Sequence, residues 1–356
     1  MIRICMIGTG YVGLVSGSCL ADFGNTVRCI DIDADRIKLL QDGQIPIYEP
    51  GLSDMVERNV ASGRLLFSTD LKEAIEHSEV IFSAVGTPAQ PDGSTNLSFV
   101  FEAAKSIAKL LNGKKVVVQK STVPVGATRQ VGELMRKHSP KGVDFEIVAN
   151  PEFLREGSAV GDFLRPNRVV IGVENEWARE VMRKVYRPLY LIETPIVLTT
   201  LETAELIKYA SNAYLATKIS FVNEIAAIAE AVDANIDDVA KGMGLDGRIG
   251  PKFLHAGVGF GGSCLPKDVL SLVHQSNTGG VKPEILEAVL RVNARLAGVA
   301  VRKVKEQLGE LDGKTIGLLG LSFKPNTDDL REAPSIRIAQ QLLDAKATVR
   351  VFDPAA

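Results

Sequence analysis

A single cysteine lies in a glycine-rich stretch that could present a nucleophile to a substrate. Residues 256–268 read AGVGFGGSCLPKD, so Cys264 is followed by Lys267 and Asp268. Cysteine reacts as the thiolate, which a nearby lysine favours, and glycines leave room for a substrate to approach the backbone. The alternative is that Cys264 is a small buried apolar residue, which is the commoner role of a free cysteine.

Two polar residues, Lys208 and Asn212, are spaced four apart in a second stretch that could do chemistry. The segment 202–232 has helical periodicity and contains no glycine or proline. Residues four apart project from one face of a helix, so the ammonium and the amide would point the same way. Few charges surround them, which predicts burial, and a buried lysine needs a partner or a task. The alternative is a pair of solvated polar residues.

The N-terminal segment has the glycine spacing that binds a pyrophosphate. An apolar strand leads into Gly8, Gly10 and Gly13, a helical stretch follows, and a second apolar strand comes next. Gly8 permits a tight turn, Gly10 lets backbone N–H groups reach the pyrophosphate, and Gly13 allows close packing of helix on strand. The segment therefore predicts a dinucleotide site, with a Rossmann unit that has lost its ligand as the alternative.

Asp31, at the end of the second strand, indicates which dinucleotide this unit would bind. A carboxylate at this distance from the glycines accepts a hydrogen bond from the ribose 2′-hydroxyl and repels a 2′-phosphate. The sequence therefore predicts NAD rather than NADP. Arg36 is a counter-signal, because an arginine near this position can accommodate a 2′-phosphate.

Three further apolar segments end in polar residues or proline, over residues 79–89, 114–126 and 144–157. The carboxyl ends of parallel strands meet at one edge of a sheet, where open α/β proteins bind their ligands. The side chains that we expect to face this crevice are Thr87, Ser121, Thr122, Glu152 and Glu156. For any one of them, a role in a turn or a helix cap is an equal alternative.

These elements predict an α/β fold of two Rossmann-like parallel-sheet domains bridged by a helical central domain with a long helix. We expect an NAD-binding domain over residues 1–199, a central domain over 200–311 and the start of a C-terminal domain over 312–356. The last segment reads as one strand, one helix and one strand. Two strands bury little surface on their own, so we expect this domain to be truncated here and completed by further strands.

The composition narrows the classes of partner. A net charge of −2 gives no basic footprint for nucleic acid, and no apolar run approaches the roughly 20 residues of a membrane span. The start of the chain lacks the features of a signal peptide. The remaining cysteines, Cys5, Cys19 and Cys29, form no C-x-x-C pair and lie near no histidine cluster, so we expect neither a metal site nor a disulfide framework. A cytoplasmic location fits best.

Together these motifs resemble one family, the nucleotide-sugar dehydrogenases of the UDP-glucose/GDP-mannose dehydrogenase family. The matching stretches follow the family's order over almost the whole chain: IGTGYVGL, PIYEPGL, VGTP, STVPVG, NPEFLREGSAVGDFLRPNRVVIG, ELIKYASNAYLATKISFVNE, VGFGGSCLPKD and GLSFKPNTDDLREAPS. The resemblance implies two Rossmann-like domains joined by a long helix that mediates homodimer formation. It also implies some tens of residues beyond the last one here.

The resemblance further implies a four-electron oxidation of a sugar nucleotide at C6, from alcohol through aldehyde to acid, with two NAD molecules in turn. The stretch over residues 150–172 is most similar to members that convert UDP-glucose to UDP-glucuronate, with GDP-mannose or another nucleotide sugar as the alternative. Cys264 would add to the aldehyde as a thiohemiacetal, which is oxidised to a thioester and then hydrolysed. Lys208 and Asn212 would stabilise the oxyanion.

The same resemblance assigns the remaining site residues. Asp268 would handle a proton or the hydrolytic water, and Glu152 with Thr122 would act as base through water; the choice of base among Glu152, Glu156 and Asp268 stays open. The implied sugar-nucleotide contacts are Glu152, Phe153, Leu154, Arg155, Glu156, Lys208, Asn212, Arg248, Phe253, Leu254, His255, Ala256, Gly257, Gly261 and Lys324. The implied NAD contacts are Gly8, Gly10, Tyr11, Val12, Gly13, Asp31, Arg36, Thr87, Ser121, Thr122, Glu156, Lys267 and Arg331.

Two alternatives of other classes remain. A non-catalytic nucleotide-binding protein would keep the glycines but would need none of Cys264, Lys208 and Asp268. A two-electron hydroxyacid dehydrogenase of related build would need no cysteine nucleophile. The number of NADH molecules formed per sugar separates these hypotheses.

Overall fold

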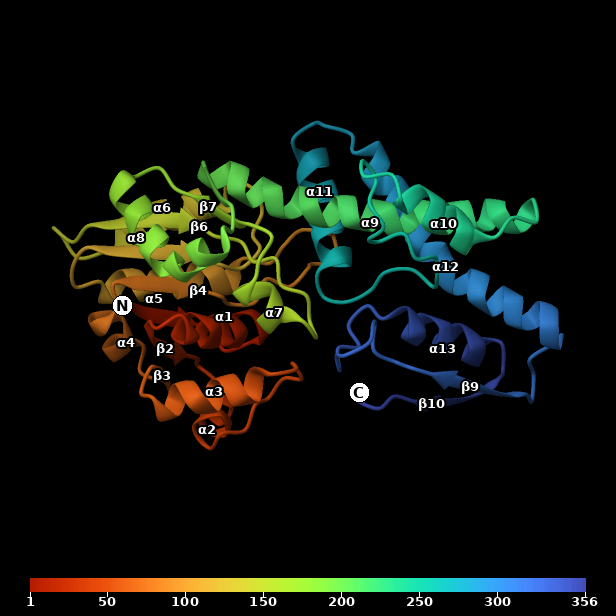
Figure 1. Cartoon of the computed structure of the whole chain (residues 1–356), viewed down its shortest axis with the longest axis horizontal. Coiled ribbons are helices and arrows are strands. Elements are labelled where there is room, and N and C mark those ends of the chain that lie inside the picture. The colour runs from red at the N-terminus through yellow and green to blue at the C-terminus, as the bar shows by residue number, and fades with distance from the viewer. The chain divides into compact units, whose positions relative to one another are not determined.

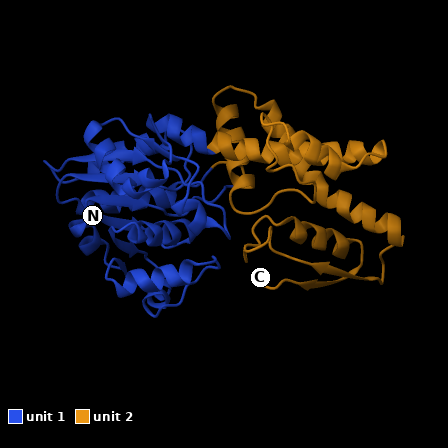
Figure 2. Cartoon of the chain, viewed as in Figure 1, with its two compact units in different colours: residues 1–90, 95–208 blue, residues 91–94, 209–356 orange.

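The computed structural model describes residues 1–356, and the chain forms two compact units. Unit 1 comprises residues 1–90 and 95–208, and unit 2 comprises residues 91–94 and 209–356 (Figure 2). No helix is both long enough and apolar enough to cross a membrane.

Unit 1 is built on an eight-stranded sheet with the order β3-β2-β1-β4-β5-β6-β7-β8 (Figure 1). Its strands are β1 Arg3–Ile7, β2 Thr26–Ile30, β3 Leu65–Ser68, β4 Val80–Ser83, β5 Lys115–Gln119, β6 Phe145–Ala149, β7 Val169–Gly172 and β8 Ile196–Thr199. Neighbouring strands are parallel except at β6 and β7, which share a single antiparallel pair, Ala149 with Gly172. The carboxyl ends of β1, β4, β5 and β6 therefore meet along one edge.

Helices cover both faces of this sheet, because successive residues of each buried strand point to opposite sides. Ile4 and Met6 of β1 pack into one core, whereas Cys5 and Ile7 pack into the other. The first core is closed by α1 Tyr11–Asp22, α2 Ala34–Gln41, α3 Leu52–Ala61, α7 Ala159–Leu164 and α8 Glu176–Val185, which leads into the 3₁₀ helix η1 Arg187–Ile192. The second is closed by α4 Leu71–His77, α5 Ser98–Leu110, α6 Ala127–His138 and the start of α9 Leu201–Ala231.

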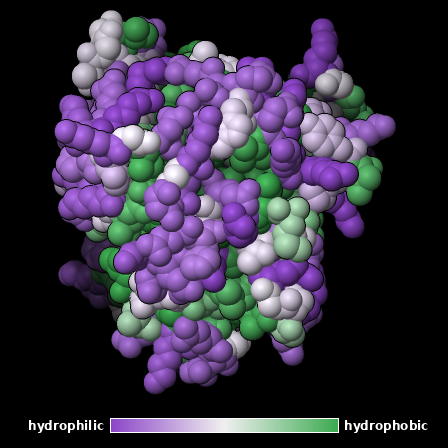
Figure 3. Space-filling model, turned by 90° about the vertical axis from the view of Figure 1, so that its left-hand side faces the viewer, coloured by the Kyte–Doolittle hydropathy of each residue, from purple (hydrophilic) through white to green (hydrophobic).

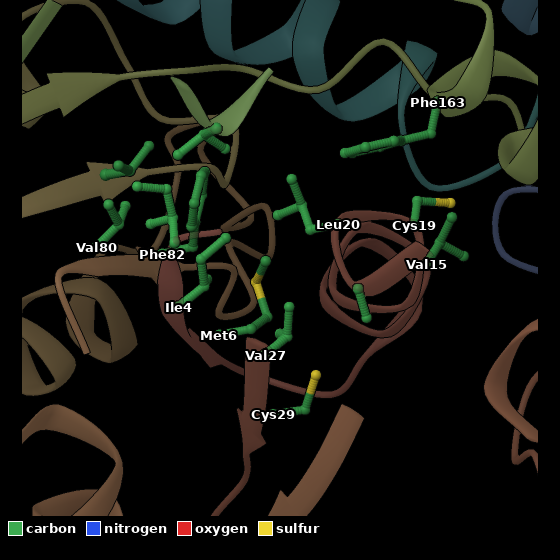
Figure 4. Packing of buried hydrophobic residues seen from close by; sticks show 14 of the residues in the cluster. Ile4, Met6, Val15, Cys19, Leu20, Val27, Cys29, Val80, Phe82 and Phe163 are labelled. Atoms are coloured by element: carbon green, nitrogen blue, oxygen red, sulfur yellow. The ribbon is translucent and has the colours of Figure 1, made fainter. Parts of the chain in front are cut away.

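The first of these cores explains two of the cysteines. Figure 4 shows Cys19 of α1 and Cys29 of β2 among apolar side chains such as Leu20 and Val27. Both thiols are fully buried, and burial raises their pKa well above the ordinary range. They are therefore packing residues of the core. The outer face of unit 1, by contrast, is covered mainly by polar side chains (Figure 3).

Unit 2 consists of helices and a two-stranded parallel sheet. Its elements are the rest of α9, then α10 Ile236–Gly244, α11 Leu265–Thr278, α12 Glu284–Leu308, β9 Thr315–Leu319, α13 Pro334–Asp344 and β10 Thr348–Phe352. Apolar residues of α9, α11 and α12 pack together around Val269, and a separate small core joins α12 and α13 to the sheet. The predicted class, an α/β fold with a mainly parallel sheet, a long central helix and a small C-terminal sheet, is confirmed.

Gly13 lies where α1 crosses the turn after β1, and it gives a test of this packing. A Cβ atom there would collide with the carbonyl oxygen of Gly8, so we expect Gly13→Ala to destabilise the protein by about 1–3 kcal/mol. The matched control is Gly10→Ala, since a Cβ at Gly10 would meet no atom within 4 Å. Thermal unfolding of both variants measures the difference, and equal melting temperatures would contradict the assigned contact.

Candidate functional site

The loop between β1 and α1 has the geometry of a pyrophosphate site. Gly8 adopts a left-handed conformation with φ of 94°, and a Cβ there would lie 2.7 Å from the carbonyl oxygen of Ala84. Gly10 forms the N-cap of α1 and borders open space, so a ligand can approach the first N–H groups of the helix. Of the other predicted contacts in this loop, Val12 and Tyr11 begin the helix and are partly exposed.

Asp31 lies beside this loop, and its carboxylate is held in place by hydrogen bonds. One carboxylate oxygen accepts hydrogen bonds from the Thr9 backbone N–H at 2.7 Å and from its hydroxyl at 2.8 Å, and the other accepts from the Asp33 N–H at 3.1 Å. Burial raises the pKa of Asp31, but these hydrogen bonds outweigh it and hold the pKa below its ordinary value. Arg36 forms an ion pair of 3.9 Å with Asp33. The residues present thus fit a dinucleotide whose ribose hydroxyls meet a carboxylate.

The carboxyl ends of β5 and β6, together with residues of α6 and α9, border a small, partly open pocket of about 10 Å³ in unit 1. Its lining includes Ser121, Thr122 and Lys208, which the sequence predicted as site residues, together with Gln119 and Glu205, which it did not. The Ser121 hydroxyl donates to the Val85 carbonyl at 2.6 Å, which ties the ends of β4 and β5 together. Thr87 lies beyond β4 and is partly exposed.

Glu152 and Lys208 form a buried ion pair with a distance of 2.9 Å between the carboxylate oxygen and Nζ. Their side chains are 5% and 4% exposed, respectively. Burial alone would raise the pKa of Glu152, but the Lys208 ammonium, a 2.5 Å hydrogen bond from the Leu154 N–H and the charge of Lys120 together hold it below the ordinary value. Glu152 is therefore an ionised carboxylate within the protein interior.

The residues that follow Glu152 differ in how far they are engaged. The Phe153 ring lies under the Arg168 guanidinium at 3.5 Å and within 5.3 Å of the Lys208 ammonium. Arg155 is exposed and donates three hydrogen bonds to Asp162, of 2.9 Å from its backbone N–H and of 2.9 and 2.6 Å from its guanidinium. Leu154 and Glu156 are partly exposed, as a residue that contacts a ligand would be.

Unit 2 contains a second cluster, centred on Asp268. Asp268 is 1% exposed and accepts a 2.6 Å hydrogen bond from the Asn212 amide and another of 2.6 Å from the Lys267 ammonium. Burial lowers the pKa of Lys267, but Asp268 outweighs that effect and raises it, with smaller help from Tyr209 and Cys264. Asp268 thus forms an ion pair with Lys267 and a hydrogen bond with Asn212 at the same time.

Cys264 is the N-cap residue of α11, and it is partly exposed, in contrast to the other three cysteines. The start of a helix carries a partial positive charge that favours a thiolate, and Lys267 adds a full charge one turn later. The Ser263 hydroxyl lies 3.5 Å from the sulfur. Neighbouring Gly262 donates its N–H to the Arg331 carbonyl at 2.9 Å, so the cysteine loop lies beside the segment that follows β9.

The other predicted substrate contacts of unit 2 lie on loops. Arg248 is exposed and forms an ion pair of 2.6 Å with Asp246. Leu254 is buried, Phe253, with φ of 65°, is partly exposed, and His255, Ala256 and Gly257 are exposed. Gly261 is buried, and a Cβ atom there would collide with the Glu332 carbonyl oxygen. The Lys324 ammonium lies 5.5 Å from the Phe323 ring. Arg331 forms an ion pair of 2.7 Å with Asp329. The structure thus places Gly261, Cys264 and the segment with Arg331 together.

Sequence reasoning missed the residue that positions the loop after β6. Glu49 is a buried carboxylate that accepts hydrogen bonds from the Gly157 N–H at 2.7 Å and the Val160 N–H at 3.3 Å, and from the Tyr11 hydroxyl. It therefore links the start of α1 to the Glu152–Gly157 loop. The motif PIYEPGL contained it, but an acidic residue between two loop prolines gives no local signal of such a distant partner.

Comparisons with known proteins match the whole chain. Three family models fit in order: "UDP-glucose/GDP-mannose dehydrogenase family, NAD binding domain" over residues 2–190, its central domain over 202–295 and its UDP binding domain over 317–356. The chain is 54% identical to the UDP-glucose 6-dehydrogenase of Rhizobium meliloti, covering 99% of this chain and 82% of that protein. It is 49% identical to the UDP-glucose 6-dehydrogenase TuaD of Bacillus subtilis, covering 100% and 77%.

Solved structures agree with these matches. A UDP-glucose dehydrogenase from Pyrobaculum islandicum superimposes with a TM-score of 0.97 at 41% identity, covering 100% of this chain and 82% of that one. A GDP-mannose dehydrogenase from Pseudomonas aeruginosa superimposes with a TM-score of 0.68 at 36% identity, covering 99% and 81%.

The buried ion pair makes a prediction about stability. We expect Lys208→Met to destabilise the protein at neutral pH by about 3–5 kcal/mol, because it leaves the Glu152 carboxylate buried without its main partner. In the parent, a depressed folded pKa means that Glu152 stabilises the fold above its unfolded pKa, and this contribution is lost as pH falls through the folded pKa. The gap in melting temperature should therefore narrow from pH 7 towards pH 4.

The control for this prediction is the double variant Glu152→Gln with Lys208→Met, which leaves no buried charge of the pair. It should recover part of the lost melting temperature. A gap that stays constant with pH would show that Lys208 acts through packing alone.

Proposed function

Because the chain belongs to the UDP-glucose/GDP-mannose dehydrogenase family, we propose that it oxidises UDP-glucose at C6 to UDP-glucuronate with two molecules of NAD. The choice of sugar nucleotide is supported by the identity of 54% to a protein named UDP-glucose 6-dehydrogenase. Among the solved structures, a UDP-glucose dehydrogenase is 41% identical and a GDP-mannose dehydrogenase is 36% identical. GDP-mannose is the second candidate, because that structure covers 99% of this chain.

The protein is an NAD-dependent dehydrogenase, as the sequence predicted, and the NAD-binding family model covers the β1–α1 loop and Asp31. NAD supplies the chemistry of hydride acceptance, and the chain must hold it in place. The Gly8–Gly13 loop and the first turn of α1 would hold the pyrophosphate, and the ionised Asp31 would accept hydrogen bonds from the ribose hydroxyls.

The single observation that carries the mechanism is the pair of hydrogen bonds that Lys267 and Asn212 donate to Asp268. Lys267 and Asp268 lie about one helical turn after Cys264 on α11, and Asn212 comes from α9. In the first oxidation, the C6 hydroxyl must lose a proton to a base, and the alkoxide must be stabilised. The Lys208 ammonium and the Asn212 amide, one turn apart on α9, would donate to that oxygen. Glu152 is an ionised acceptor that would take the proton through a water held with Thr122.

The second oxidation needs a nucleophile, because loss of hydride directly from an aldehyde carbon would leave a high-energy acylium ion, whereas a tetrahedral adduct can lose hydride as its C=O bond re-forms. The Cys264 sulfur would add to the aldehyde carbon, and the carbonyl oxygen would take up a proton, which gives a thiohemiacetal. Loss of a hydride and that proton leaves a thioester. Water then displaces the sulfur, with Asp268 positioned to accept a proton, and the acid and the free thiol result. One UDP-glucose thus consumes two NAD molecules and one water.

Each unit carries candidate contacts for the sugar nucleotide. In unit 1, Phe153 is fixed by Arg168, and the loop from Glu152 to Glu156 offers N–H groups and carboxylates. In unit 2, Lys324 and the residues from Phe253 to Gly257 would bind the diphosphate and the sugar. Arg331, on the segment after β9, is proposed as an NAD contact on the family resemblance alone.

We also propose that two copies of the chain associate through α9. Tyr214, Phe221 and Ile228 follow at intervals of seven residues, so they form one stripe along the helix, and they are 62%, 48% and 53% exposed. Large apolar side chains in a regular stripe are typical of a helix that packs against a partner.

We also propose a cytoplasmic location, since the buried Cys5, Cys19 and Cys29 are free thiols.

The oxidation is tested by counting NADH per sugar. With UDP-glucose limiting and NAD in excess, we expect about two NADH for each UDP-glucose consumed, since alcohol-to-acid conversion releases four electrons. One NADH per sugar would favour a two-electron dehydrogenase, and none would favour a nucleotide-binding protein. GDP-mannose serves as the parallel substrate.

In the same assay, Cys264→Ser should lose at least about a hundredfold in formation of UDP-glucuronate, because a serine hydroxyl is far less nucleophilic than a thiolate. Mass spectrometry of the parent quenched during turnover should detect the acyl adduct on residue 264. The control is Cys19→Ser, whose sulfur is buried in the core away from the site. Normal turnover by Cys264→Ser would exclude the thioester.

Association through the apolar stripe on α9 is tested by placing a charged side chain in it. We expect Phe221→Asp to shift the protein from the mass of two chains towards that of one, because a carboxylate in the centre of an apolar contact is desolvated without a partner. Light scattering after size-exclusion chromatography measures the mass. Lys241→Asp on α10 is the control for a surface charge change, and a parent that elutes as a single chain would exclude the proposal.

A further inference from the structure

Lys120, directly after β5, is a buried lysine without a carboxylate among its hydrogen-bond partners. It is 4% exposed, and its ammonium donates to the Asn150 side-chain oxygen at 3.2 Å and lies 3.5 Å from the Tyr186 hydroxyl. The Phe163 ring lies 5.8 Å away on the same side. Its surroundings are thus an amide, a phenol and an aromatic face.

A charge in such a place weakens the fold. Burial lowers the pKa of Lys120 to about 8, and although Glu152 favours the charged form, Lys208 opposes it. At neutral pH the ammonium is therefore charged, and its desolvation is only partly offset by two neutral hydrogen-bonding groups. An apolar residue of similar length would pack against Phe163 and Tyr186 without this loss. Stability alone therefore does not account for a lysine here.

The partners of Lys120 lead to the Glu152 carboxylate. Asn150 is held on three sides: its backbone N–H donates to the Gln119 carbonyl at 2.9 Å, its amide donates to the Val170 carbonyl at 2.8 Å, and its side-chain oxygen accepts from the Tyr186 hydroxyl at 2.5 Å. Because β6 and β7 share only one residue pair, the hydrogen bond from the Asn150 amide to Val170 is a further link between the end of β6 and β7. Two residues after Asn150, the chain reaches Glu152.

We propose that Lys120 is a positioning residue for the oxidation: its buried charge, anchored by Asn150 and Tyr186, helps to hold Glu152 as a carboxylate. The inference rests on the proposed function, in which Glu152 accepts a proton. The other charged groups that face Glu152 are Lys208, which bonds to it directly, and Arg168, whose guanidinium lies over Phe153. Lys120 adds a charge that no other carboxylate neutralises.

The sign of each effect follows from these contacts. Loss of the Lys120 charge raises the pKa of Glu152, so the acid limb of kcat moves to higher pH. Because the folded pKa of Lys120 lies below its unfolded value of about 10.4, the unfolded chain binds the proton more tightly, and the buried ammonium destabilises the fold at neutral pH. The same variant should therefore gain stability and lose activity at acid pH, a combination that a purely structural residue does not give.

The test compares Lys120→Met and Lys120→Gln with the parent. For both we expect the acid limb of kcat to move up by about one pH unit, with little change in the KM for UDP-glucose. The Glu152 carboxyl signal in a ¹³C NMR titration, assigned with Glu152→Gln, should move by the same amount, and Lys120→Met should melt at a higher temperature. Tyr186→Phe keeps the charge and should melt lower, with the acid limb unchanged.

Two results would overturn the proposal. One is a Glu152 titration that is unchanged in both Lys120 variants. The other is a parent-like pH profile in Lys120→Gln but not in Lys120→Met, which would assign the effect to the hydrogen bond with Asn150. The NMR titration needs no substrate, so it decides the role of Lys120 even if the parent does not oxidise UDP-glucose, an outcome that would refute only the proposed function.

Discussion

An ionised carboxylate inside a protein requires a counter-charge at a fixed distance, and the buried pair of Glu152 and Lys208 meets this requirement. Glu152 is placed by the end of β6, whereas Lys208 is placed by the rotation of α9 about its axis. A helix turned by one residue would move the ammonium by about 100° around the axis and leave the carboxylate unpaired. The pair therefore depends on how α9 is fixed against the sheet.

The first turns of α9 provide that fixation. Glu205 accepts hydrogen bonds from the N–H groups of Gly126 at 2.6 Å and Thr128 at 2.8 Å, at the start of α6. Arg129 of α6 donates a hydrogen bond of 2.6 Å to Glu202, which lies in the first turn of α9 ahead of Lys208. A carboxylate at a helix N-terminus is favoured by the exposed N–H groups there. The start of α6 thus sets the rotation of α9, and α9 in turn presents Lys208 to Glu152 and Asn212 to Asp268.

Local pattern predicted much of this arrangement. The glycine spacing and the alternation of apolar and polar segments indicate the β1–α1–β2 unit, and the uninterrupted helical stretch predicts α9, because these features depend on residues close in the chain. The partners of buried charges could not be found this way. Glu152 and Lys208 are 56 residues apart and Lys120 and Tyr186 are 66 apart, so only the sheet order and helix packing bring them together. The sequence also predicts that Lys208 and Asn212 on α9 are buried, and they are. It gives no sign that Tyr214 on the same helix is exposed, because that depends on which other helices pack against α9.

The cysteines show how far surroundings rather than residue type determine chemistry. Cys5 lies on the central strand β1, where burial raises the pKa of the thiol to about 12, and neither Arg28 nor Lys115 offsets that effect. Such a thiol is neutral at physiological pH and unreactive. Cys264 has the opposite setting: partly exposed, at the start of a helix of 14 residues, with Lys267 held charged one turn away by Asp268. A nucleophile in this fold must therefore lie outside the sheet, where loop glycines admit a substrate and a helix start favours the thiolate.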